Sequence, residues 1–167
     1  EILKMLYRDN EILIFDEPFS GFDPINANLL KEAIIELRDK GATILLSTHN
    51  MASVEELCDS ITLINKGVSI LQGKVNDIKR QHDTHRREII VRTNDIQPLF
   101  ALGDTYNNIK VEPTDVHDEV KLTTYNESPN ELLSQLLGIG QLVSYKELLP
   151  SMNDIFIHEV QSQNQAS

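Results

Sequence analysis

Two adjacent carboxylates, Asp16 and Glu17, follow the continuous apolar run of residues 12–15 in this 167-residue chain. An unbroken apolar run of this length is typical of a strand covered on both faces, as in a parallel sheet. Such sheets bind ligands at the carboxyl ends of their strands. One carboxylate could hold a hydrated Mg²⁺, which prefers oxygen ligands, and its neighbour could polarise an attacking water. The simpler alternative is a strand that ends in solvent with polar residues.

Two further segments with polar side chains follow the acid pair. Residues 20–24 read Ser-Gly-Phe-Asp-Pro, in which Asp23 is an expected N-cap and Pro24 the first residue of a helix that runs to about residue 40. Residues 47–49 read Ser-Thr-His at the end of a second apolar strand that starts at residue 42. A histidine at this position could donate a hydrogen bond to a phosphate oxygen or hold a water molecule, although a lone histidine there is more often structural.

The order strand, helix, strand predicts a βαβ unit with parallel strands. Helical spacing at residues 2–7 indicates a helix in which the chain starts, so we expect a further segment upstream. After the second strand the pattern predicts a short helix over 51–58, a hairpin of strands 60–65 and 68–72 around Asn65-Lys66-Gly67, and a helix over 73–80.

The second half of the chain predicts a separate small domain. Residues 81–87 are polar without apolar periodicity and are interpreted as a linker. The order βαββαβ, expected of the ferredoxin-like arrangement, follows within residues 88–160. Its elements are expected at strand 88–93, helix 95–102, strand 108–112, strand 119–124, helix 128–137 and strand 141–147, with a last helix over 151–160. Residues 161–167 are expected to be disordered.

Composition excludes several classes of protein. The 15 basic and 26 acidic residues give a net charge of −11, which disfavours a nucleic-acid partner. The single cysteine, Cys58, excludes an internal disulfide framework and is interpreted as a packing residue. No apolar run is long enough for a transmembrane helix. His82, His85, His117 and His158 lie among polar residues and are interpreted as surface histidines.

Taken together, the strand ending in Asp-Glu-Pro, the Ser-Gly-Phe-Asp-Pro segment and the strand ending in Ser-Thr-His resemble the ATP-binding-cassette (ABC) ATPases. The resemblance implies that Asp16 closes the Walker B strand and helps to hold Mg²⁺ through water. It implies that Glu17 is the catalytic carboxylate and that His49 is the switch histidine, which contacts the γ-phosphate of ATP. The implied cofactors are ATP and Mg²⁺.

The same resemblance makes residues 20–23 the D-loop, in which Ser20 and Asp23 belong to the nucleotide-binding site. Here Ser-Gly-Phe-Asp replaces the commoner Ser-Ala-Leu-Asp, which changes packing rather than chemistry. ABC ATPases work as pairs, so a second nucleotide-binding subunit is implied, in a homodimer or a heterodimer. An integral membrane permease subunit is the other implied partner. It would hold the protein on the cytoplasmic side of the plasma membrane.

The resemblance covers residues 1–80 and lacks several family motifs. The sequence contains no GxxxxGK[ST] loop (Walker A), no Gln loop and no LSGGQ-like signature. The fold expected is therefore α/β, the C-terminal part of a P-loop NTPase (ABC ATPase) domain followed by a small ferredoxin-like domain. This chain alone is expected neither to bind ATP tightly nor to hydrolyse it.

Residues 150–157, Pro-Ser-Met-Asn-Asp-Ile-Phe-Ile, resemble the Pro-Ser-Leu-Glu-Asp-Ile-Phe ending of bacterial exporter ATPases of the multidrug or antibiotic type. An exporter ATPase is thus the leading hypothesis. Two alternatives remain open at this point. One is a soluble ABC ATPase of DNA repair, chromosome maintenance or translation. The other is a non-catalytic regulatory remnant of a cassette.

Overall fold

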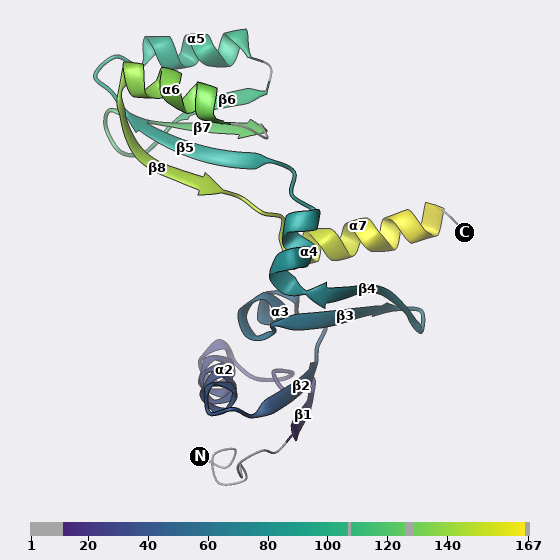
Figure 1. The fold of residues 1–167 in the computed structure, drawn as a ribbon. Helices are drawn as coiled ribbons and strands as arrows, with labels where there is room; N and C mark the ends of the chain where they lie inside the picture. Colours follow the sequence, from purple (N-terminus) through teal and green to yellow (C-terminus); the bar gives the residue numbers. More distant parts are fainter. Residues whose placement is uncertain (1–11, 107, 126–128, 166–167) are drawn as a thin grey trace. The chain divides into compact units, whose positions relative to one another are not determined.

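The computed structural model describes residues 12–106, 108–125 and 129–165 (Figure 1). The chain divides into two units. The first contains Glu1–Ile78 and Ser151–Ser167, and the second contains Lys79–Pro150. The helix expected over residues 2–7 lies outside the described residues.

The first unit begins with β1 (Ile12–Asp16), α2 (Pro24–Asp39) and β2 (Thr43–Ser47). β1 and β2 pair in parallel, so the predicted strand, helix, strand unit is present. Asp23 caps α2 with its side chain, as expected, and Pro24 is its first residue. The register places Asp16 opposite Ser47, which brings the polar carboxyl ends of the strands together.

The apolar run is typical of strands covered on both faces, whereas one face of β1 and β2 is exposed in the part of the chain that the structure describes. The side chains of Ile12, Ile14 and Leu45 are 68%, 72% and 60% exposed, whereas alternate residues of both strands are half-buried. A single βαβ crossover places its helix on one face of the sheet, so covering the other face requires a further layer.

The hairpin of β3 (Ser60–Asn65) and β4 (Val68–Lys74) turns where it was predicted. Lys66 and Gly67 both have positive φ, +49° and +78°, as a two-residue type I′ hairpin turn requires. The remaining helices that pack in this unit are α3 (Met51–Leu57), the start of α4 (Val75–Gln81) and α7 (Met152–Gln165). Their shared core consists of Val54, Val75, Ile78, Met152 and Ile155.

α7 shows that the units differ from the domains expected from the sequence. It was expected at the end of a domain over 88–160, but Met152 and Ile155 are buried in the core of the first unit. Glu55 of α3 also accepts a hydrogen bond from the Met152 backbone N–H at 2.6 Å. The helix continues to Gln165, so most of the tail expected to be disordered from residue 161 is helical.

The second unit has the predicted order of elements: β5 (Arg86–Arg92), α5 (Gln97–Thr105), β6 (Ile109–Pro113), β7 (Glu119–Tyr125), α6 (Asn130–Ile139) and β8 (Gln141–Glu147). The strands form one antiparallel sheet in the order β6-β7-β5-β8. α5 and α6 cover one face of it (Figure 1). The core between them consists of Ile89, Val91, Leu99, Ile109, Val120, Leu122, Leu132 and Leu136.

The linker is shorter than residues 81–87 because both of its ends are ordered in secondary structure. Gln81 is the last residue of α4, and β5 begins at Arg86. Arg87 is buried within the second unit, where its guanidinium lies 2.9 Å from Asp83 and 3.3 Å from Glu147. None of the described helices combines the length and the apolar character needed to cross a membrane.

Candidate functional site

The candidate site lies at the carboxyl ends of β1 and β2. The Ser47 hydroxyl donates a hydrogen bond to Oδ1 of Asp16, the residue that faces it across the strand pair. The backbone N–H of Glu17 extends the pairing by one residue, donating to the Ser47 carbonyl at 3.0 Å and to the Ser47 hydroxyl at 3.3 Å. Ser47 therefore contacts both members of the acid pair.

Glu17 leaves the strand in an unusual backbone conformation. Its φ is +42°, in the left-handed region that a residue with a Cβ rarely adopts. Such a conformation costs of the order of 1–3 kcal/mol and persists only where neighbouring contacts hold it. Here the two hydrogen bonds from the Glu17 N–H to Ser47 supply those contacts.

The Glu17 carboxylate lies against the residues that follow β2. Its Oε1 accepts a hydrogen bond from the His49 backbone N–H at 3.0 Å and lies 2.7 Å from the His49 ring atom Nδ1. Oε2 accepts a longer bond, 3.4 Å, from the Thr48 hydroxyl. The Glu17 side chain is 39% exposed and that of His49 is 87% exposed, so water and ligands can reach both. The structure thus places Glu17 in direct contact with His49, and Ser47 links Asp16 to the Glu17 backbone.

Asp23 is not aimed at this cluster. Its Oδ1 accepts hydrogen bonds from the backbone N–H groups of Ile25 and Asn26, at 2.9 and 3.1 Å, and its Oδ2 accepts one from the Asn26 side chain. These bonds, with the Asn26 backbone first among them, hold the pKa of Asp23 below its usual value. Ser20 is tied to the site through its backbone N–H, which donates to the Glu17 carbonyl at 3.1 Å.

Sequence reasoning did not assign Ser47 and Thr48 to the site. The only signal for them was their position at the end of the second strand, directly before His49. Their contacts to Asp16 and Glu17 depend on the register of β1 and β2, which places residues 31 positions apart side by side. A one-residue shift of that register would turn these side chains to the opposite face.

The donor set at this edge fits a magnesium ion. Asp16 offers carboxylate oxygens, the hard ligands that Mg²⁺ prefers. The Ser47 hydroxyl engages Oδ1, and a carboxylate with one engaged oxygen still presents Oδ2 to a metal ion or its water. The site therefore combines a carboxylate for a cation, a second carboxylate for a water and a histidine beside it.

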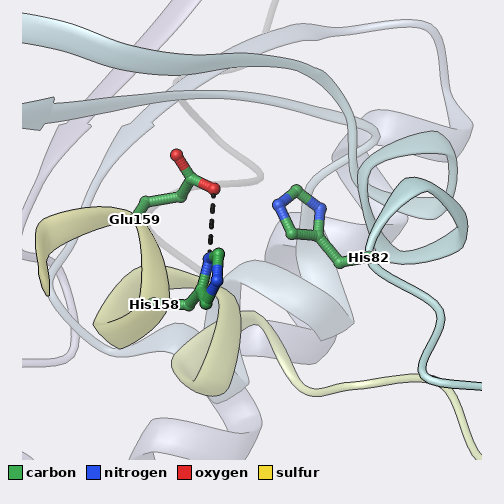
Figure 2. A group of neighbouring side chains, drawn as sticks. All are labelled: His82, His158 and Glu159. Carbon is green, nitrogen blue, oxygen red and sulfur yellow. Dashed lines mark ion pairs between the residues drawn. The ribbon is translucent and has the colours of Figure 1, made fainter. Parts of the chain in front are cut away.

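Cys58 is interpreted from the sequence as a packing residue, and His82, His85, His117 and His158 as surface histidines. Burial, with the nearby charge of Asp59, raises the pKa of the Cys58 thiol, which makes it a poorer nucleophile. On α7, His158 Nδ1 lies 3.5 Å from Glu159 Oε1 (Figure 2). His82 is drawn with them but belongs to the second unit, so we assign no metal site to these residues.

The fold and the site define a mixed α/β protein with its polar cluster at the carboxyl edge of a parallel strand pair. Comparison with known proteins gives the family. Residues 73–160 match the model of the C-terminal domain of DrrA1-3-like ATP-binding proteins. The chain belongs to this family of ABC transporter ATP-binding proteins.

The names of individual relatives are consistent with this family. An uncharacterised ABC transporter ATP-binding protein of Bacillus subtilis, YhaQ, is 39% identical over 90% of this chain and 49% of its own length. The Nod factor export ATP-binding protein I of Cupriavidus metallidurans is 31% identical over 93% of this chain and 49% of its own. A fluoroquinolones export ATP-binding protein of Mycobacterium tuberculosis is 36% identical over 53% of this chain and 30% of its own. The chain thus spans at most about half the length of these relatives.

Proposed function

We propose that this chain carries the water-activating part of the ATP-hydrolysing subunit of an ABC transporter. The observation that carries the proposal is the juxtaposition of Asp16, Glu17 and His49 at one strand edge, with Glu17 Oε1 in contact with two nitrogens of His49. The family membership supports the same function, because its members are ATP-binding proteins of ABC transporters.

In this proposal each side chain has a separate task. Asp16 would hold Mg²⁺ through a water molecule, and the ion would supply positive charge against the phosphate oxygens of ATP. Glu17 orients the attacking water and accepts its proton. His49 contacts the γ-phosphate through its ring. Its backbone N–H also donates to Glu17, so the carboxylate stays held when the ring turns toward the phosphate.

Ser20 and Asp23 act in the proposal as the D-loop, which couples the sites of two paired subunits. The backbone bond from Ser20 to Glu17 and the cap formed by Asp23 support this role, since they fix the loop between the carboxylate and α2. The partners proposed are a second nucleotide-binding subunit and an integral membrane permease. The protein then works on the cytoplasmic face of the plasma membrane and not on nucleic acid, to which its net charge of −11 is unfavourable.

Export is the direction of transport that we infer. The names of relatives from Mycobacterium tuberculosis and Cupriavidus metallidurans, which refer to export of fluoroquinolones and of Nod factor, support it. For the second unit we infer the ferredoxin-like arrangement. The order β6-β7-β5-β8, with α5 and α6 on one face, supports that assignment.

The experiment that tests the function compares two charge-neutralising variants of the full-length protein. Glu17→Gln is expected to lower ATP turnover by roughly 10²–10⁴-fold, the contribution of a general base, while ATP binding is retained. Glu32→Gln, on the exposed face of α2, is the matched control and should hydrolyse ATP at the wild-type rate. Near-wild-type turnover in Glu17→Gln would contradict the role of Glu17.

The 167-residue chain supplies a second test, because the proposal requires phosphate-binding motifs that its sequence lacks. We expect it to show no ATP hydrolysis above a buffer control. Absence of hydrolysis in the wild-type full-length protein, assayed with its permease, would instead favour a regulatory cassette.

A further inference from the structure

The Ser47 hydroxyl makes two contacts at the candidate site that strand pairing does not require. It donates a hydrogen bond to Asp16 Oδ1 and accepts one from the Glu17 backbone N–H at 3.3 Å. The same N–H already donates to the Ser47 carbonyl at 3.0 Å. Because the Ser47 carbonyl already completes the pairing of the strands, the Ser47 hydroxyl can donate its hydrogen to the Asp16 carboxylate.

A serine hydroxyl has one hydrogen to donate, and here that hydrogen goes to a carboxylate. Hydrogen bonds with an ionised acceptor are shorter and about twice as strong as neutral ones. The bond fixes the rotation of the Asp16 carboxyl group, with Oδ1 directed to β2. The acceptor side of the hydroxyl helps to hold the left-handed backbone of Glu17, whose φ is +42°.

We infer that Ser47 is a positioning residue for the acid pair, which orients the Asp16 carboxylate toward a divalent cation and holds Glu17 in its turn. The inference rests on the proposed function, since it takes Asp16 as the residue that holds the magnesium ion. It adds a residue whose hydroxyl acts through Asp16 and Glu17 rather than on the nucleotide.

The test measures cation affinity in the full-length protein. Mn²⁺ replaces Mg²⁺ because it prefers the same oxygen ligands and is visible by electron paramagnetic resonance. Mn²⁺ is titrated in the presence of the non-hydrolysable ATP analogue AMP-PNP. Ser47→Ala should weaken Mn²⁺ binding by roughly 10-fold, the lower end of the usual effect of removing a partner of a metal ligand, because Asp16 acts on the ion through a water molecule. The Mg²⁺ concentration for half-maximal ATP hydrolysis should rise in parallel.

Matched variants separate the hydroxyl from a general effect on the fold. Ser47→Thr keeps the hydroxyl and should bind Mn²⁺ as the wild type does. Ser69→Ala makes the same deletion at an exposed position of β4 and should leave Mn²⁺ binding unchanged. Ser47→Cys, which keeps a similar size but offers only a weak donor, replaces Ser47→Ala if that variant does not fold.

Wild-type Mn²⁺ affinity in a folded Ser47→Ala or Ser47→Cys variant would overturn the inference, as would a Ser47→Thr variant as weak as Ser47→Ala. Asp16→Asn distinguishes this failure from failure of the proposed function. If Asp16→Asn weakens Mn²⁺ binding while removal of the hydroxyl does not, only the role of Ser47 is refuted. If Asp16→Asn binds Mn²⁺ like the wild type, the metal role proposed for Asp16 fails, and the role of Ser47 fails with it.

Discussion

Gly140 allows a sharp test of packing in the second unit, because it lies where α6 ends and β8 begins. Its φ of −165° is ordinary extended backbone that any residue can adopt, so the constraint on position 140 is the space available for a side chain. A Cβ at this position would lie 2.5 Å from the Arg92 carbonyl oxygen, 2.9 Å from Thr93 Cβ and 2.9 Å from Val91 Cγ1. The closest of these atoms belongs to the backbone of the central strand β5. Gly140→Ala therefore requires β5 or the end of α6 to move.

The expected cost follows from overpacking of a filled interior. Insertion of one methyl group into a well-packed site destabilises by about 1–3 kcal/mol. For a unit of the size of residues 79–150, each kcal/mol shifts Tm by about 4–8 °C. We expect Gly140→Ala to lower Tm of this unit by roughly 5–20 °C.

Gly138 is the matched control, since it lies two residues earlier, in the last turn of α6. It is exposed, and a Cβ there meets no atom within 4 Å among those the structure describes. Alanine stabilises a helix interior relative to glycine by about 0.8–1 kcal/mol, and a position in the last turn by less. Gly138→Ala is therefore expected to raise Tm, so the same substitution should have opposite signs at the two positions.

The assay is thermal and urea unfolding of the 167-residue chain, followed by tyrosine fluorescence. Of the four tyrosines, Tyr106, Tyr125 and Tyr145 lie in the second unit, and the chain has no tryptophan. Hydrogen exchange should show the loss of protection in β5 and β8. The reasoning is refuted if Gly140→Ala unfolds at the wild-type midpoint, or if the two variants shift Tm in the same direction.

Two further predictions concern stability. The Arg87 guanidinium lowers the pKa of Asp83 in the folded protein, mainly through their hydrogen bonds. Asp83 therefore stabilises the second unit fully above its ordinary pKa of 3.8, and this stabilisation is lost as the pH falls through the lowered pKa of the folded state. Asp83→Asn should cost about 1.5–3 kcal/mol in urea unfolding at pH 7 and remove that pH dependence; an unchanged urea midpoint would contradict it. Met152→Ala, at a fully buried position, should destabilise the first unit by about 2–5 kcal/mol. Hydrogen exchange should become faster in α3 and α7 but not in β5–β8. Unchanged exchange in α3 would refute the packing of α7 against it.

Features that depend on a few neighbouring residues could be predicted from the sequence. The cap formed by Asp23 and the turn at Lys66-Gly67 lie where the residue types place them. The reciprocal bonds of Ser151 and Asp154 at the start of α7 are a further example. Each of these features is satisfied within four residues, so local chemistry suffices.

Features that depend on packing partners could not be predicted in this way. The sequence of α7 does not state which unit the helix packs with, and the burial of Met152 and Ile155 beside Val54 assigns it to the first. The linker was expected to extend to residue 87 because residues 81–87 are polar and have no apolar periodicity. Pairing of β5 with β7 and β8, together with the carboxylates around Arg87, draws both residues into the sheet.

At the candidate site, the sequence by itself determined which chemical groups are available: an acid pair after an apolar strand, and a histidine after the next one. The tertiary structure decided how they meet. Parallel pairing in one register sets Asp16 against Ser47, and the left-handed turn at Glu17 brings its carboxylate to His49. Sequence patterns report local preference and burial, whereas contacts between residues 31 or 32 positions apart arise only when two strands share one sheet.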